Sequence, residues 1–140
     1  MTALHLLVRT VHVLGMVVLL GGSASAWNAL RSDPDPGLLV RYEWLFWGTT
    51  GAMLVTGVGN LGALGAPGPA TRWGTVLTVK LALVLAFVVG SAVRTLAVER
   101  LRAREDGTLA AARDPLRRLY AATTVVLLAV VVLAEVLAHG

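Results

Sequence analysis

The sequence predicts an all-α integral membrane protein, built as a bundle of four membrane-spanning helices. Hydrophobic residues make up 56% of the 140 residues and charged residues only 14%, and the mean hydropathy is +0.76. A soluble domain of this length has too much surface facing water to carry so apolar a composition. Four apolar stretches are present, each close to the ~20 residues that cross a hydrocarbon core of about 30 Å. They cover residues 6–27, 42–64, 74–97 and 119–138.

Little of the chain lies outside these spans, so we expect residues 1–140 to form a single domain. The first span contains Ala24-Ser25-Ala26, which resembles a signal-peptide cleavage site. Its apolar run is longer than a typical signal sequence, so we expect it to be retained as a span. The second and fourth helices are expected to begin at Asp35-Pro36 and Asp114-Pro115. An Asp N-cap followed by Pro satisfies the free amides of a helix start.

The second link, between the second and third spans, holds the turn-forming run Gly65-Ala66-Pro67-Gly68-Pro69, which predicts a short connection. Small residues recur at helical spacing within two spans and predict close approach of helix backbones in lipid. These residues are Gly22 and Ala26 in the first span and Ala82, Ala86 and Gly90 in the third.

The arginines predict how the bundle is oriented. The link between the third and fourth spans holds six arginines, the first link two and the second link one. The positive-inside rule therefore places the first and third links in the cytoplasm and both termini outside. This topology explains the net charge of +4, so nucleic acid is not an expected partner. The aromatic residues expected at the inner interface are Trp27, Tyr42, Trp44, Trp47 and Tyr120, with Trp73 at the outer one.

One stripe of the first span carries most of the unusual chemistry. His5, Arg9, His12 and Met16 follow one another at helical spacing inside an apolar run. Ionisable groups are expensive in lipid, so they indicate a functional site. His12 lies too deep for its short side chain to reach the interface, which makes it the leading candidate for a ligand or a proton-handling group.

Other polar residues fall at the same level of the membrane in the predicted orientation. Asn60, Lys80, Glu135 and His139 all lie in the outer half, and Glu135 is the expected counter-ion of Arg9 or Lys80. No comparable polar set is expected in the inner half. The sequence therefore predicts one site, in the outer half of the bundle.

Two cofactors suit this site. Cu(I) suits the soft pair His12 and Met16, one helical turn apart, with His5 as a further ligand. However, Arg9 and Lys80 bring positive charge, which favours an anionic ligand. A b-type haem takes imidazole at its iron and cationic partners at its propionates. The charge balance thus favours haem b with His12 as axial ligand, with copper as the alternative. The second axial ligand is expected from His5, from His139 or from a second copy of the chain.

The middle of the chain resembles the copper-resistance D (CopD) membrane domain. The resemblance rests on Arg41 opening the second span, Thr56-Gly57 late in it, and Arg94 closing the third span. It rests also on the run TRWGTVLTVKLALVL at residues 71–85 and on HVLGMVVLLGG at residues 12–22. It implies copper passage or tolerance.

The chain is also distantly similar to the HemJ-type protoporphyrinogen oxidases, in size and in number of helices. That family pairs a first-helix histidine with a lysine that follows a tryptophan in a later helix, and His12, Trp73 and Lys80 would match. The tryptophan and the lysine are more widely spaced here than in that family. This similarity implies haem-dependent redox work.

We therefore expect a multi-pass protein of a bacterial or archaeal cytoplasmic membrane with a haem-dependent electron-transfer or redox role. Copper binding or transport is the alternative, and a non-catalytic subunit of a larger membrane complex is a second one. Expected partners are the lipid bilayer, a second copy sharing the site, and a periplasmic redox or metal-delivery protein. Cysteine is absent, which excludes disulfides and thiolate metal sites. Neither a nucleophile–base pair nor a phosphate loop is present, so hydrolase and kinase chemistry has no support.

Overall fold

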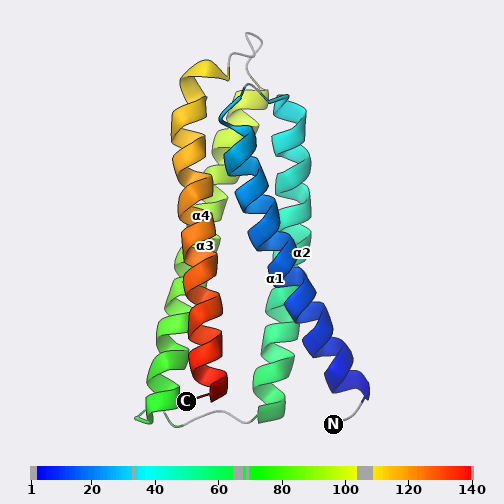
Figure 1. Cartoon of the computed structure of the whole chain (residues 1–140), viewed down its shortest axis with the longest axis vertical. Coiled ribbons are helices and arrows are strands. Elements are labelled where there is room, and N and C mark those ends of the chain that lie inside the picture. Colours follow the sequence, from blue (N-terminus) through cyan, green and yellow to red (C-terminus); the bar gives the residue numbers. More distant parts are fainter. Residues whose placement is uncertain (1–2, 33, 65–67, 69, 104–108, 140) are drawn as a thin grey trace.

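The protein, described by a computed structural model, consists of four long helices joined by short links (Figure 1). The structure describes residues 3–32, 34–64, 68, 70–103 and 109–139, without the side chains of 60–64 and 137–139. The helices are α1 (Ala3–Ala29), α2 (Pro36–Leu64), α3 (Arg72–Arg102) and α4 (Ala110–His139). The described residues form no strand, so the predicted all-α class is confirmed.

The helices form a closed ring in which each packs against its neighbours in the chain. The contacting pairs are α1 with α2, α2 with α3, α3 with α4 and α4 with α1, and the seam between α2 and α3 is the sparsest. Short links make neighbouring helices antiparallel, so both chain ends lie at one end of the bundle (Figure 1). We call this the termini end. The opposite end, which carries the links 30–35 and 103–109, is called the arginine end.

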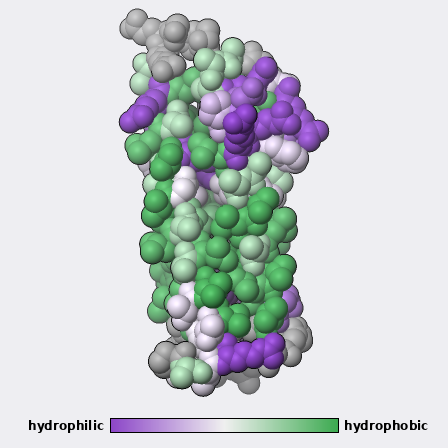
Figure 2. Space-filling view, turned by 90° about the vertical axis from the view of Figure 1, so that its left-hand side faces the viewer, coloured by the Kyte–Doolittle hydropathy of each residue, from purple (hydrophilic) through white to green (hydrophobic). Residues whose placement is uncertain are grey.

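Each helix is several residues longer than a membrane crossing requires. They contain 27 to 31 residues, which corresponds to about 40–46 Å. Helices α1, α3 and α4 are also apolar enough to span, whereas the apolar stretch of α2 is interrupted by Arg41 and Glu43 and by several Gly and Thr residues. A broad apolar band separates two polar ends of the molecule (Figure 2). The molecule is therefore a membrane-embedded bundle.

Most of the buried residues lie in the half of the bundle nearer the arginine end. The buried residues of α1 are Leu19, Ser23 and Ala26, all in its second half. In α3 only Gly74 is buried before Phe87. Toward the termini end α1 diverges from its neighbours (Figure 1). The half that was predicted to hold the site is thus the loosely packed half.

The two Asp-Pro pairs behave differently. Helix α2 begins at Pro36, and the Asp35 carboxylate accepts a hydrogen bond from the Gly37 amide at 3.0 Å, so this predicted start is confirmed. The start predicted at Asp114-Pro115 is wrong, because α4 begins at Ala110 and Pro115 lies inside it. Pro115 costs one backbone hydrogen bond near the helix start. Burial of Leu109 in the core at the arginine end offsets that loss.

The predicted close approach at small residues is found in α1 but not in α3. Gly22 lets α1 approach Tyr42, since a Cβ at Gly22 would lie 2.5 Å from the Tyr42 ring. The predicted packing stripe of α3, residues Ala82, Ala86 and Gly90, is wrong because all three are exposed. Helix α3 instead buries a different face, which carries Phe87, Ser91 and Arg94.

Candidate functional site

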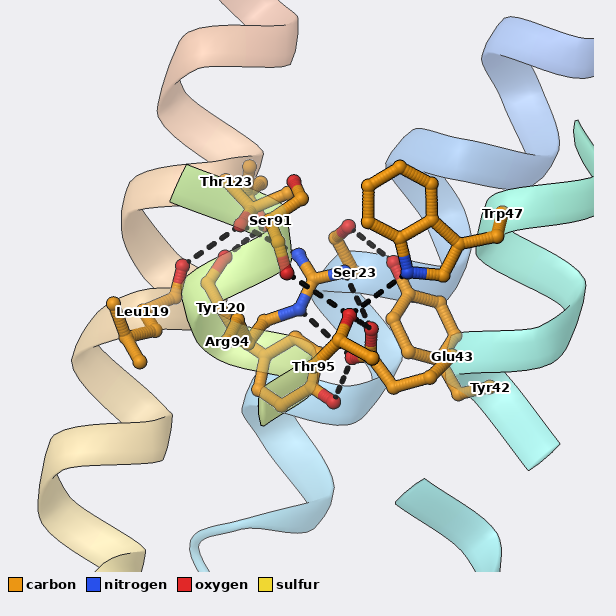
Figure 3. Close-up of polar contacts among 11 residues, drawn as sticks. Ser23, Tyr42, Glu43, Trp47, Ser91, Arg94, Thr95, Leu119, Tyr120 and Thr123 are labelled. Atoms are coloured by element: carbon orange, nitrogen blue, oxygen red, sulfur yellow. Dashed lines mark hydrogen bonds and ion pairs between the residues drawn. The ribbon is translucent and has the colours of Figure 1, made fainter. Parts of the chain in front are cut away.

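A buried ion pair lies at the centre of the arginine-end half. Arg94 of α3 is 0% exposed and Glu43 of α2 is 2% exposed. The Arg94 Nε atom donates to Glu43 Oε1 at 2.8 Å and Nη2 donates to Oε2 at 3.1 Å (Figure 3). This two-point geometry is the strong form of an arginine–carboxylate contact. The pair joins α2 to α3.

Further hydrogen bonds extend the ion pair into a network. Glu43 also accepts from the hydroxyls of Thr95 and Tyr120, each at 2.6 Å. Trp47 donates to Thr95 at 2.8 Å, and Arg94 Nη1 donates to Thr123 at 2.7 Å. Because Tyr120 and Thr123 belong to α4, three helices meet in this network (Figure 3).

Aromatic rings enclose the guanidinium and bring in the fourth helix. The Arg94 Cζ atom lies 4.2 Å from the Phe46 ring centroid and 4.7 Å from that of Tyr120. The Tyr42 ring lies 5.6 Å away, and its hydroxyl shares a hydrogen bond of 2.5 Å with Ser23 of α1. The buried charge is therefore compensated by a carboxylate, hydroxyls and ring faces.

This network corrects two predictions. The expectation that the half near the arginine end holds no polar set comparable to that around His12 is wrong. The assignment of Tyr120 to an aromatic belt is also wrong, because Tyr120 is 0% exposed and points inward. Glu43, Arg94 and Tyr120 all lie near the edges of their predicted spans. Charged and aromatic residues are common at such edges, so the sequence did not mark these three as interior. The opposite signs of Glu43 and Arg94 on adjacent helices were the signal in the sequence.

The structure places His12 at the contact between α1 and α2. It is half-buried, and its Nδ1 atom lies 2.9 Å from Thr56 Oγ1. The Thr56 hydroxyl donates its one proton to the carbonyl of Ala52 at 2.8 Å, with Met53 O at 3.2 Å. When Thr56 uses its proton in this way, it accepts from His12 and Nδ1 carries the ring proton. In this tautomer Nε2 keeps its lone pair and is able to bind a metal.

Met53 lies at the same contact between α1 and α2 as His12, and Met16 follows His12 by one turn of α1. Met53 of α2 lies against Gly15, where a Cβ would come within 2.6 Å of the sulfur, and His12 lies against Gly57. Met16 packs against the apolar cluster that contains Met53. Glycines on both helices thus leave room for the His12 imidazole and the Met53 side chain at this contact. Met53 was expected only to pack, and its place at this contact was missed because it lies on a different helix from His12.

The other predicted residues are spread around this point. The Lys80 charge of α3 acts on His12. Arg9 is exposed and lines a hollow on the outward face of α1 with Leu6 and Val13. His5 lies about 10 Å from His12 along the helix axis, so the structure does not bring these imidazoles together.

The remaining predicted residues are Glu135, Asn60 and His139. Glu135 is exposed on α4, and its predicted pairing with Arg9 or Lys80 stays a prediction. The side chains of Asn60 and His139 lie outside the described residues.

The donor set around His12 suits copper better than haem. Among the described residues, no three His, Asp or Glu side chains come together as a metal-binding group, so a metal at His12 needs methionine sulfur. Sulfur and imidazole together suit Cu(I). Of the two surface hollows, one lies on α1 and includes Arg9, the other lies between α1 and α2 and includes Trp44, and neither is lined by His12. Neither hollow supports a haem at this imidazole, so haem b stays a prediction of the sequence.

Fold and site together define a class: a small polytopic helical membrane protein with a buried ion pair inside its bundle. A model of the family described as copper resistance protein D matches residues 36–137. This match covers well over half of the chain, which therefore belongs to the CopD family and confirms the resemblance seen in its sequence. It contains Glu43, Arg94 and Tyr120, whereas α1 with His12 precedes it. No curated protein and no solved structure matches the chain.

Proposed function

We propose that this membrane protein binds copper as Cu(I) between α1 and α2, in the half of the bundle nearer the termini, and handles it as cargo. The proposed ligands are His12 Nε2 and the sulfur atoms of Met16 and Met53. His5, also predicted as a ligand, is too distant to belong to the same ion. The family's description as a copper resistance protein supports copper handling.

The observation that carries the proposal is the hydrogen bond between His12 and Thr56. It holds the proton on Nδ1 and leaves Nε2 as a ligand beside thioethers. An imidazole oriented by a second hydrogen-bond partner is the usual arrangement at protein metal sites. A histidine kept only for packing would not need this control of its tautomer.

Cu(I) binding by the purified protein tests the proposal. The affinity is measured in detergent by competition with a coloured Cu(I) chelator, for wild type and for His12→Ala, Met53→Leu and Met16→Leu. We expect each variant to bind at least about tenfold more weakly. His5→Ala is the matched control and should bind as wild type. Equal affinity in wild type and His12→Ala would exclude the proposed site.

The same sample distinguishes the haem alternative. An absorption spectrum with a Soret band that is lost in His12→Ala would support haem and overturn the copper proposal. A colourless protein that binds one copper per chain would support copper. Haem-dependent electron transfer and the similarity to HemJ-type oxidases stay predictions of the sequence.

The cellular setting is part of the proposal. We place the protein in a bacterial or archaeal cytoplasmic membrane, with the termini end outside, where a periplasmic metal-delivery partner would reach His12. A homodimer that shares the site also stays a prediction of the sequence.

A further inference from the structure

The contact between α2 and α3, called the seam, combines sparse helix packing with several buried hydrogen bonds. It is the sparsest of the four helix contacts, yet much of the buried polar network crosses it. Arg94 donates two hydrogen bonds to Glu43 across this seam, and Thr95 donates a third. Trp47 donates a fourth, to Thr95. Polar contacts thus supply an unusually large part of the cohesion between these two helices.

Two buried hydroxyls lie on α2 and α3, one to two turns from Glu43 and Arg94 toward the termini end. Thr50 of α2 is 4% exposed and Ser91 of α3 is 1% exposed. Among the described residues, neither hydroxyl oxygen has a hydrogen-bond partner. Buried hydroxyls are normally paired with protein or water. Water entering between α2 and α3 would satisfy both.

The same seam closes the way from the His12 site to the arginine end. Beyond the loosely packed half, the bundle axis is filled first by an apolar cluster that includes Phe46 and Phe87, and then by the Arg94–Glu43 layer. A second apolar cluster, with Leu39 and Val98, lies at the arginine end. A cation cannot cross these layers while they remain packed.

We propose that Glu43, Arg94 and Thr95 form a latch that closes the seam between α2 and α3, and that copper moves from the His12 site toward the arginine end only when the latch opens. The passage of copper rests on the proposed function, whereas the opening of the seam does not. Separating α2 from α3 breaks the hydrogen bonds of the latch and lets water reach Thr50 and Ser91.

Thiol labelling tests the opening directly, because the chain contains no natural cysteine. Ser91→Cys is nearly isosteric and places one thiol beside the latch, where a water-soluble maleimide reaches it only through an open seam. Thr95→Val removes a hydroxyl that contacts both Glu43 and Trp47 while leaving the ion pair in place. We expect it to speed labelling of Cys-substituted Ser91 roughly 30-fold, as for the loss of two hydrogen bonds.

Thr124→Val is the matched control, since the Thr124 hydroxyl donates only to the Tyr120 carbonyl of its own helix. It should label as the parent does. Glu43→Gln removes the charge and should label faster than Thr95→Val. Equal labelling rates in the Thr95→Val, Thr124→Val and parent proteins would overturn the latch.

Copper entry into proteoliposomes tests the second half of the proposal. Thr95→Val should speed entry of Cu(I) to a similar extent and leave the Cu(I) affinity at His12 unchanged. Faster labelling without faster copper entry would overturn the role in passage. If wild type binds no copper at all, the proposed function fails, while the labelling rates still decide whether the latch exists.

Discussion

His12 illustrates how one hydroxyl decides what a histidine can do. The Thr56 hydroxyl contacts both the His12 imidazole and a carbonyl of its own helix. In the tautomer with the ring proton on Nδ1, Nε2 is the nitrogen able to bind a metal. The depth of His12 in an apolar run predicts a functional residue, and that role stays a prediction. Thr56 and Met53 lie more than forty positions from His12 in the sequence, and only the fold brings them to the same helix contact.

Thr56→Val is predicted to weaken Cu(I) binding by roughly tenfold, because the imidazole loses the acceptor that fixes its tautomer and orientation. The measurement is chelator competition with the purified protein. Thr78→Val is the matched control, since the Thr78 hydroxyl donates only to the Gly74 carbonyl within α3. Equal weakening in both variants would show that Thr56 has no special role at the site.

Lys80→Gln is predicted to leave Cu(I) affinity equal or to increase it, because a positive charge that acts on His12 is removed. A haem propionate would lose a charged partner, so the same change would weaken haem retention. The two cofactors therefore respond in opposite directions. Copper titration of the variant, with its absorption spectrum, measures both responses. Weaker copper binding in Lys80→Gln would contradict the proposed site.

At the scale of the helices, one buried ion pair joins α2 to α3 within a bundle otherwise packed through apolar clusters. Glu43 and Arg94 each lie one turn or less inside the predicted edges of their spans. The sequence alone gives them the appearance of ordinary interfacial charges. The helices extend well past those edges toward the arginine end, so both residues become interior. Span prediction located the helices well but placed these two charges wrongly.

Glu43→Ala is predicted to destabilise the bundle by about 3–5 kcal/mol, because it leaves the Arg94 charge buried and unpaired. Replacing both partners, as in Glu43→Leu with Arg94→Met, should recover much of that loss, since no buried charge remains. Thermal unfolding in detergent compares the three proteins. A double variant no more stable than Glu43→Ala would mean that burial of the unpaired charge is not the cause.

Gly22→Val is predicted to destabilise the contact between α1 and α2 by about 1–3 kcal/mol, because its side chain would overlap the Tyr42 ring. Gly21→Val, at the neighbouring position, meets no atom within 4 Å and should be tolerated. Unfolding temperatures of the two variants measure the difference. Similar temperatures would indicate that Tyr42 moves aside without cost.

At the scale of the whole molecule, composition alone predicted the class and the number of helices. Apolar runs of spanning length leave few alternatives in a chain of this size. The unequal packing of the two halves was not predicted, because it depends on which faces meet across four helices. Small residues at helical spacing do not specify a partner, as the exposed stripe of α3 demonstrates.

The orientation of the bundle is predicted from six arginines in the third link against one in the second. A reporter fused after Gly140 should be active only if it functions outside the cytoplasm. A second fusion in the link around residue 105 is the control and should give the opposite result. Strong activity of a cytoplasm-only reporter after Gly140 would invert the topology and place His12 on the inner side.

The bundle is tightly packed toward the arginine end and loosely packed toward the termini end. A small tilt of a helix about its tightly packed part therefore moves its other end further. Arg94 and Lys80 lie on the same helix, 14 residues apart, or about 21 Å along its axis. If the Arg94 layer acts as a pivot, a tilt of about 5° there moves the Lys80 level by about 2 Å. A displacement of that size is comparable to the length of a metal–ligand bond. A small tilt of α3 at the Arg94–Glu43 ion pair would thus produce a larger displacement at the level of His12. The geometry of a metal bound at His12 would then depend on how the ion pair is packed.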